Sequence, residues 1–265
     1  MKYAFFQGCK IPYYLPNYGI SSRAVLNAFD IELIDLEFNC CGYPVRHLSL
    51  EASVLSAAKN IAMCEKLGLN IVTPCKCCFG NLKQSDFFLK EDSSLQKSVN
   101  SKLSEDGLEW NGKVEIKHLL SVLHDDVGID SIKNKIKKPL SGVKIAANYG
   151  CHSLRPSRIL NFDNPMAPTI FEELIEATGA TTVDWLKRLD CCGNPLKDKN
   201  DKLSLFLTKE KLDDATQSGA KFLCNACTYC QIQFDYIKDD NQENQVSSVL
   251  YSDILAESLG LICGN

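Results

Sequence analysis

Ten of the 14 cysteines in this chain form one five-cysteine pattern that occurs twice. The first copy consists of Cys9, Cys40, Cys41, Cys75 and Cys78. The second copy consists of Cys151, Cys191, Cys192, Cys227 and Cys230. In both copies a vicinal pair precedes a glycine, and a CxxC follows after 33 residues (42–74) or 34 residues (193–226). Five thiols repeated at one spacing predict two metal centres in a duplicated chain.

A disulfide framework is the first alternative for an even number of cysteines. A chain of 265 residues with 45% hydrophobic residues is large enough to bury a core without disulfides. The start, MKYAFFQGCK, has no convincing signal peptide. Adjacent cysteines suit a bridged metal cluster better than disulfides. We therefore expect reduced thiols and a cytoplasmic location.

The composition gives no support to two other classes of protein, those that bind nucleic acids and those that span a membrane. A net charge of −4 gives no indication of a nucleic-acid partner. No run of 18 apolar residues occurs, so no membrane span is expected.

The ligand count favours iron–sulfur centres over zinc. A structural zinc site takes four ligands in a tetrahedron, whereas each set here offers five thiols. Iron–sulfur clusters are held by thiolates, normally four, and a fifth would bridge two irons or let one iron change its coordination. Zinc stays the minority alternative, and the number of irons is open at this point.

Each half is predicted to follow the order strand, Cys, helix, strand, CysCys, helix, strand and CxxC. In the first half these elements are expected at 3–6, 21–29, 31–36, 52–67 and 70–73. In the second half they are expected at 143–147, 169–178, 181–185, 203–215 and 221–223. Alternating strands and helices predict an α/β fold of two tandem, similar parallel-sheet domains, 1–140 and 141–265, related by a pseudo-twofold. Ligand-binding residues then lie at the carboxyl ends of the strands.

Residues 90–140 are polar and rich in lysine, which predicts a solvated helix and linker between the domains. Outside the two sets, Cys64 is expected in the core, and Cys77, Cys224 and Cys263 are not expected to be ligands. Cys224 permits a second CxxC with Cys227, but Cys230 fits the repeat spacing better.

His152, directly after Cys151, and His47, after the first CCG, are both more typical of structural histidines than of acid–base groups. If the centres are catalytic, His152, next to Cys151, is the nearest candidate in sequence for a proton source, and Cys9 and Cys151 are the other catalytic candidates.

At this point the residues resemble the B-type subunits of heterodisulfide reductases, proteins built from two CCG domains. The resemblance covers nearly the whole chain. It is carried by YAFFQGC, IVTPCKCCFGNL, NYGCHSLRPS, APTIFEELIEATGA, CTYCQIQFD and SVLYSDILAESLGL. After the first cysteine pair the chain departs from methanogen members, with Gly-Tyr-Pro-Val in place of Pro-Ala-Pro-Gly, which favours a substrate other than the methanogen heterodisulfide.

The resemblance implies two noncubane 4Fe–4S clusters, each held by the five cysteines of one half, with a disulfide cleaved between them. It also implies a flavin-containing partner of the A type and a small ferredoxin-like partner of the C type. The alternative is an electron-transfer protein without its own substrate, as in lactate- or glycolate-oxidising complexes. Retention of all ten cysteines favours the reductase.

Overall fold

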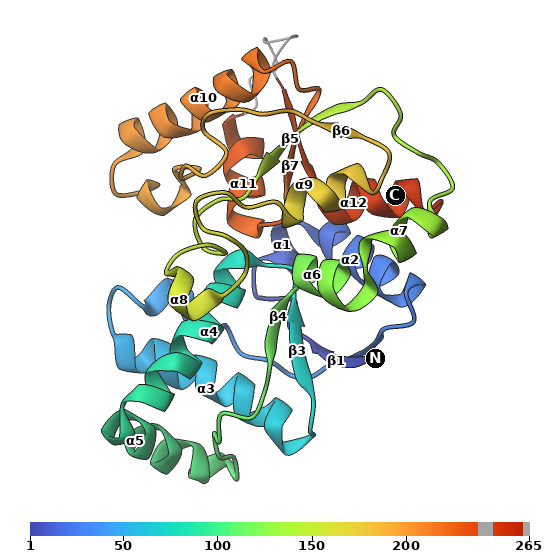
Figure 1. Ribbon diagram of the computed structural model, residues 1–265. Helices are drawn as coiled ribbons and strands as arrows, with labels where there is room; N and C mark the ends of the chain where they lie inside the picture. Colours follow the sequence, from blue (N-terminus) through green and yellow to red (C-terminus); the bar gives the residue numbers. More distant parts are fainter. Residues whose placement is uncertain (238–245, 262–265) are drawn as a thin grey trace.

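The computed structural model describes residues 1–237 and 246–261 and contains two four-stranded parallel sheets (Figure 1). The strand orders are the same, β2-β1-β3-β4 in the first sheet and β6-β5-β7-β8 in the second. This confirms the predicted α/β fold with two similar parallel-sheet domains. The boundary at residue 140 stays a prediction.

The first half runs through β1 (Lys2–Phe5), α1 (Ile11–Tyr14), α2 (Pro16–Ala28), β2 (Glu32–Ile34), η1 (Tyr43–Val45), α3 (Leu50–Lys66), β3 (Asn70–Thr73), α4 (Lys76–Glu91), α5 (Ser93–Leu103), η2 (Ser104–Asp106) and β4 (Ile116–His118). The connection consists of α6 (Leu119–Ser121), the π-helix η3 (Val122–Val127) and α7 (Ile129–Lys135). The second half runs through β5 (Lys144–Asn148), α8 (Ser157–Leu160), α9 (Ile170–Glu176), β6 (Thr181–Thr182), η4 (Asn194–Leu196), α10 (Asp201–Gln217), β7 (Phe222–Asn225), α11 (Thr228–Ile237), β8 (Ser247–Leu250) and α12 (Tyr251–Ser258).

The central strands are buried on both faces because helices cover both sides of each sheet. In β1, β3, β5 and β7 every residue after the first is buried. Such strands read as continuous apolar runs rather than alternating ones, which is the pattern expected for parallel sheets. The strands before Cys9, Cys75, Cys151 and Cys227 are therefore the rigid part of each half.

The long helix after each CCG loop begins at a side-chain cap. Ser49 Oγ accepts a hydrogen bond from Ala52 N at the start of α3, and Asn200 Oδ1 accepts one from Leu203 N at the start of α10. Gly42 and Gly193, the glycines of the two CCG motifs, both have φ of +90°. A Cβ atom there would collide with the carbonyl oxygen of Ser53 or Ser204, one turn into the helix. The glycines thus let each CCG loop lie directly on its helix.

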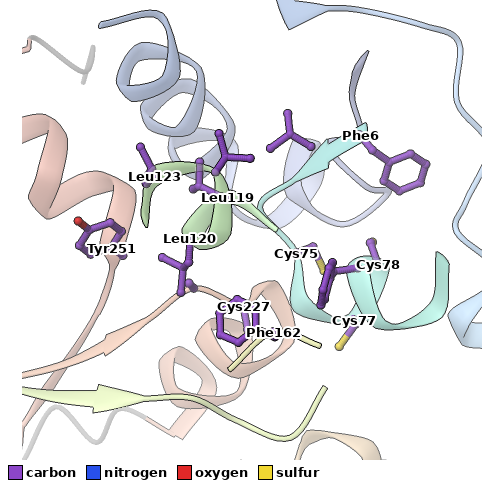
Figure 2. Packing of buried hydrophobic residues seen from close by; sticks show 14 of the residues in the cluster. Phe6, Cys75, Cys77, Cys78, Leu119, Leu120, Leu123, Phe162, Cys227 and Tyr251 are labelled. Atoms are coloured by element: carbon purple, nitrogen blue, oxygen red, sulfur yellow. The ribbon is translucent and has the colours of Figure 1, made fainter. Parts of the chain in front are cut away.

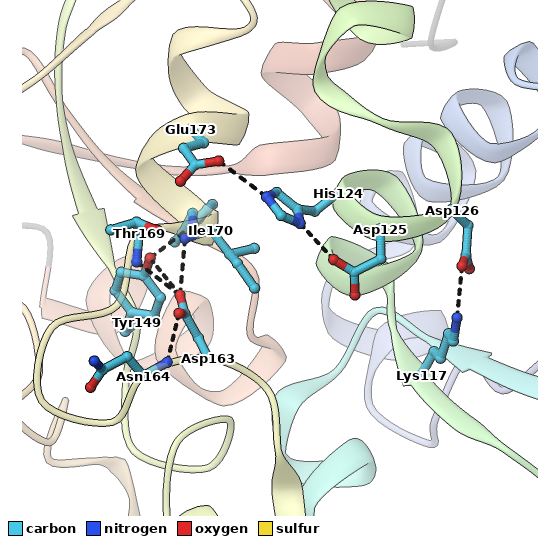
Figure 3. Close-up of polar contacts among 11 residues, drawn as sticks. Lys117, His124, Asp125, Asp126, Tyr149, Asp163, Asn164, Thr169, Ile170 and Glu173 are labelled. Atoms are coloured by element: carbon cyan, nitrogen blue, oxygen red, sulfur yellow. Dashed lines mark hydrogen bonds and ion pairs between the residues drawn. The ribbon is translucent and has the colours of Figure 1, made fainter.

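The two halves exchange their last helices. Helix α12, at the end of the chain, lies against α2 of the first half (Figure 1), where Ser21 Oγ and Ser252 Oγ are 2.7 Å apart. The helical segment after β4 lies against α9 of the second half, and His124 Nε2 is 3.1 Å from Glu173 Oε2 there (Figure 3). Each half therefore completes its core with an element of the other.

The prediction of a solvated connector at residues 90–140 is wrong. This segment supplies β4, the fourth strand of the first sheet, and the buried turn 119–123. Its lysines lie on the outer faces, while sparse apolar residues such as Val99, Leu103 and Ile116 are buried. The second strands are shorter than predicted, and in the second half β6 ends at Thr182, because the chain leaves the sheet so that Trp185 Nε1 can donate to Ala147 O.

Three smaller observations concern the two remaining cysteines, Cys64 and Cys263, and the question of membrane spans. The prediction that Cys64 belongs to the core is confirmed, because its side chain on α3 is fully buried. Cys263 lies outside the described residues. Within those residues, the helices fall short of the length and apolar character needed to span a membrane.

Replacing Gly42 by Ala should destabilise the fold more than the same change at Gly68. Both glycines have positive φ, but a Cβ at Gly68 meets nothing within 4 Å. Gly68→Ala should therefore cost about 1 kcal/mol of left-handed strain. Gly42→Ala adds the backbone collision and should cost about 3 kcal/mol or more of unfolding free energy, measured by urea denaturation. Equal costs would show that the loop does not rest on α3 as described.

Candidate metal centres

The five thiols of each half gather where the strands end. Cys9 follows β1 and Cys75 follows β3, while Cys151 and Cys227 follow β5 and β7. The carboxyl ends of parallel strands share one edge of the sheet, which brings these thiols together. The CCG loop then adds the vicinal pair from the end of β2 or β6. We call the two groups the first thiol set (Cys9, Cys40, Cys41, Cys75, Cys78) and the second thiol set (Cys151, Cys191, Cys192, Cys227, Cys230).

Within the first thiol set each thiol interacts with the next. Cys9 Sγ and Cys40 Sγ are 3.8 Å apart. The string continues from Cys40 to Cys41, from Cys41 to Cys78 and from Cys78 to Cys75. Cys9 is exposed and Cys40 half-buried, whereas the other three are buried. The set therefore runs from the surface into the interior.

The second thiol set repeats this order. Cys151 interacts with Cys191, Cys191 with Cys192, Cys192 with Cys230 and Cys230 with Cys227. Cys191 Sγ also accepts a hydrogen bond of 3.4 Å from Gly193 N. The structure thus brings together all ten of the cysteines that the sequence assigns to centres. That each one is a ligand stays a prediction.

A glycine before the first cysteine of each set leaves room for the last one. Gly8 and Gly150 have positive φ, and a Cβ on them would lie 2.9 Å from Cys78 Sγ or 3.4 Å from Cys230 Sγ. These two clearances are part of the repeat, since both glycines precede a cysteine directly. Close approach of the backbone to a thiol is the reason for glycine at both positions.

Electrostatic repulsion between neighbouring thiolates allows only some of these thiols to ionise together. Neighbouring thiols hold the pKa of Cys40 and Cys191 far below the ordinary value. Interaction with Cys40 or Cys191 in turn raises the pKa of the first cysteine of each set, Cys9 or Cys151. A bound metal would remove this conflict, because metal ligation deprotonates thiols and compensates their charge.

Cys77, which the sequence places outside both sets, connects them. It interacts with Cys75 of the first set and with Cys227 of the second. Figure 2 shows Cys75, Cys77 and Cys78 at the start of α4, with Cys227 close by. His152 Nδ1 lies 3.4 Å from Cys77 Sγ and 3.5 Å from Cys151 Sγ. The two sets therefore form one continuous group of thiols.

Two narrow pockets, one beside each thiol set, share two tyrosines in their walls. One pocket is lined by Cys77, Cys151, Cys192, Cys227 and Cys230, and the other by Cys9, Cys41, Cys75 and Cys78. Tyr43 and Tyr229 line both pockets, with ring centroids 5.6 Å apart, and Tyr43 also packs edge-on against His152. Each pocket holds about 10 Å³, which is room for about one water molecule.

A wider groove of about 300 Å³ reaches the first thiol set from outside. Cys9 and Cys40 lie on its wall, together with Tyr13, Arg23 and Asp35. A groove of this size is in the range of small-molecule sites.

The alternative CxxC is not assembled. Cys224 is fully buried on β7, where burial raises the pKa of its thiol, and no other thiol contributes to that shift. Cys230, by contrast, interacts with Cys192 and Cys227. In the described ranges 1–237 and 246–261, no three His, Cys, Asp or Glu side chains are arranged around a single metal ion. The thiols form strings rather than closed tetrahedra.

Sequence reasoning missed the residues between the cysteines of each CxxC. Lys76 and Cys77 extend from α4 toward the second thiol set, whereas Thr228 and Tyr229 extend from α11 toward the first. The spacer positions are visible in the sequence, but their crossing to the opposite set depends on how the two halves face each other.

These features define a protein of two cysteine-rich CCG domains, and comparison with known proteins agrees. The family model of the cysteine-rich CCG domain matches residues 3–83 and 145–235. The B-type subunit of the ferredoxin/F(420)H(2)-dependent CoB-CoM heterodisulfide reductase of Methanosarcina acetivorans is 33% identical over 88% of this chain and 79% of its own length. The protein of Archaeoglobus profundus that is named for its likeness to the heterodisulfide reductase B-type subunit is 31% identical over 89% of this chain and 81% of its own.

The chain therefore belongs to the family of heterodisulfide reductase B-type subunits, which are CCG-domain proteins. The 8-methylmenaquinol:fumarate reductase membrane anchor subunit of Wolinella succinogenes is also similar, 32% identical over 91% of this chain and 84% of that protein. Among solved structures, a hypothetical protein from Helicobacter pylori has the same fold, with a TM-score of 0.75 at 17% identity. The match spans 98% of this chain but only 49% of the Helicobacter protein.

Substitutions at Cys224 and Cys230 should separate the two possible CxxC motifs. Cys230→Ser removes a thiol from the second set and should lose about half of the bound metal, because metal ligation needs the thiolate. Cys224→Ser is the matched control and should keep the metal of the wild-type protein. Metal per chain, measured by mass spectrometry after anaerobic purification, checks both. The reverse pattern would assign the ligand to Cys224.

Proposed function

We propose that this protein is the iron–sulfur subunit of a heterodisulfide reductase-like complex, in which two noncubane 4Fe–4S clusters reduce or form a disulfide. The observation that carries the proposal is the continuous group of thiols, five in each half, at the facing carboxyl edges of two similar sheets. The first set would hold one cluster and the second set the other. Family membership supports this reading, because several relatives are named as subunits of heterodisulfide reductases.

The residues present fit such clusters. Each set offers five soft thiol donors, and a glycine leaves room beside the last one. The first thiol of each CxxC, Cys75 or Cys227, lies directly before α4 or α11, and hydrogen bonds with neighbouring thiols hold its pKa well below the ordinary value. When bound, each cluster supplies one electron and an iron that accepts a sulfur.

The chain's own residues would bind the substrate, keep water out and deliver protons. Reduction of a disulfide takes two electrons and two protons and yields two thiols, so two one-electron centres held by the two thiol sets would together supply the electrons. His152 lies between Cys77 and Cys151 and can pass a proton to a departing thiolate. Burial is the main cause that raises the pKa of Tyr43 and Tyr229, so both hydroxyls stay protonated and can donate hydrogen bonds.

The substrate class is a small anionic disulfide or thiol pair. Lys10 lines the pocket beside the first thiol set and places its ammonium group 5.0 Å from the centre of the Tyr229 ring. A flavin-containing partner and a ferredoxin-like partner would supply electrons, as in the family. A cytoplasmic location belongs to the same proposal, because free thiols persist in a reducing compartment.

The second candidate is an electron-transfer subunit without a substrate of its own. The narrowness of the pockets favours it, since about 10 Å³ admits no disulfide in this conformation. The similar Wolinella protein is also named as part of a fumarate reductase. Reactivity of the reduced clusters toward disulfides separates the two candidates.

Metal analysis tests the clusters. Anaerobically purified wild-type protein should contain about eight irons and matching acid-labile sulfide per chain, because each five-thiolate set holds four irons. Cys41→Ser and Cys192→Ser should each affect the iron of one half. Zinc in place of iron, or four irons or fewer in fully loaded protein, would contradict the proposal.

Single-turnover reoxidation tests the chemistry. Reduced protein mixed with a small anionic disulfide should lose its reduced-cluster signal and release two thiols per disulfide. Cys9→Ala and Cys151→Ala should abolish this reaction. His152→Ala should slow it by about 10²-fold with unchanged iron content, because it removes the general acid.

His47→Ala serves as the matched control for the histidine, since His47 is exposed and should have no effect. If no disulfide reoxidises the reduced clusters of the intact complex, the electron-transfer candidate replaces the reductase.

A further inference from the structure

We infer that two buried lysines, Lys76 and Lys211, make the centre of the second thiol set the more easily reduced of the two. The inference deepens the proposed function and rests on it, because it requires two redox centres. It comes from a comparison of equivalent positions in the two halves. The backbone repeats around both sets, but among residues 1–237 and 246–261 the fully buried lysines lie beside the second set.

The equivalent positions are fixed by the repeat. Lys76 directly follows Cys75, and Thr228 directly follows Cys227. In the long helices, the CCG glycines lie against Ser53 in α3 and Ser204 in α10. Seven positions further along each helix are Asn60 and Lys211. The duplicated frame thus pairs Lys76 with Thr228, and Lys211 with Asn60.

Lys76 belongs to the first half, but its side chain lies beside the thiol set of the second half. Its side chain is 1% exposed, and Nζ donates hydrogen bonds to Tyr149 O at 2.8 Å and Asn148 O at 3.4 Å. These carbonyls lie just before Gly150 and Cys151. Lys76 lines the narrow pocket beside the second set together with Cys227 and Cys230. Burial lowers the pKa of Lys76, and the thiols of these two cysteines counter that lowering most strongly.

Lys211 approaches the second set from the other side. It is fully buried, and Nζ donates to Lys187 O at 2.7 Å and Asp190 O at 2.6 Å, directly before Cys191. Burial lowers the pKa of Lys211, and the thiols of Cys230 and Cys192 counter that lowering most strongly. No carboxylate forms an ion pair with Lys76 or Lys211 in the described part of the chain. Both positive charges are therefore available to the second set.

The same two positions are neutral beside the first set. Asn60 Nδ2 donates to Cys40 O at 3.2 Å and to Asn39 O at 3.3 Å. Asn39 is equivalent to Asp190, whose carbonyl oxygen accepts from Lys211, but Asn60 carries no charge. Thr228 is buried beside Cys75 and likewise carries no charge.

Other charges near the sets are closer to solvent. Lys10, next to Cys9, is only half-buried, and Asp190, next to Cys191, is exposed. Water and salt screen such charges, whereas charges in the interior act at a lower effective dielectric constant. The two buried lysines therefore dominate the difference between the sets.

Reduction adds one electron, and so one negative charge, to a centre, while a one-electron donor is oxidised. A fixed positive charge nearby stabilises the reduced form more than the oxidised form, and net charge and hydrogen bonds are known determinants of cluster potentials. The centre with two buried lysines should thus have the higher midpoint potential. An electron delivered to either centre should come to rest at the second.

A redox titration of the iron-loaded wild-type protein tests this directly. Dithionite is the donor, and electron paramagnetic resonance follows the two centres. We expect two midpoints, with the higher one at the second set. Cys40→Ser and Cys191→Ser assign the signals, since each alters the signal of its own set. A single shared midpoint, or a higher midpoint at the first set, would overturn the inference.

Lys76→Thr and Lys211→Asn give the second set the residues that lie beside the first set, Thr228 and Asn60. Each should lower the midpoint of the second centre by at least a tenfold change in its reduction equilibrium, which is 59 mV for one electron, and leave the first unchanged. Lys83→Thr is the matched control on α4, because Lys83 Nζ donates to Leu160 O and should shift neither midpoint.

Equal shifts at both centres, or no shift in loaded variants, would also overturn the inference. If a variant fails to bind iron, the wild-type titration still decides. Absence of two iron–sulfur centres in the wild type would instead overturn the proposed function, and the iron assay distinguishes that failure from this one.

Discussion

Crowding of thiols at the meeting point of two sheets is the constraint on which the rest of the structure depends. Eleven sulfurs, ten from the two sets and one from Cys77, interact in one continuous string. Like groups this close cannot all ionise in a buried site, because each thiolate raises the pKa of its neighbours. The arrangement is therefore stable with reduced, largely protonated thiols or with a metal core that compensates their charge. The glycines that flank the sets serve the same packing, since a side chain at Gly8 or Gly42 would enter the space of a thiol or of the helix behind it.

The exchange of terminal helices keeps the two carboxyl edges face to face. α12 and the helical segment after β4 each close the core of the opposite half. Two hydrogen bonds hold α12 in place: Tyr251 Oη donates to Leu174 O of α9, and Lys137 N, just after α7, donates to Ser258 O of α12. A hinge between two independent domains would let the thiol sets separate. Because the exchanged helices pack into the core of the opposite half, the packing of the two cores determines the distance between the thiol sets. The spacer residues of each CxxC can then reach across to the opposite set.

The sequence was sufficient for the fold class, the repeat and the thiol sets, because these depend on local periodicity and on spacing. The strand Asn70–Thr73 was predicted with its bounds, since it is a short apolar run between a helix and Pro74. β4 was missed because only Ile116 and His118 of its three residues are buried, in a segment whose lysines dominate the composition. Cys77 and Lys76 could not be placed, since nothing local says that a CxxC spacer faces the other half. A buried lysine is also rare enough that composition argues for exposure.

Duplication explains why the two sets resemble each other, and later substitutions explain why they differ. The elements required to gather five thiols (strand ends, CCG glycines and the helix behind each loop) are the same in both halves. Among the positions that differ are three that face a set without belonging to it: Asn60 against Lys211, Thr228 against Lys76, and Tyr229 against Cys77. Such positions change the charge and polarity around a centre at little cost to the fold, because the backbone contacts are kept. The equivalence of Asn60 and Lys211 illustrates this, since both donate hydrogen bonds to carbonyls of the CCG loop, but only one brings a charge. A duplicated frame can in this way hold two centres of one design with different electrostatic surroundings.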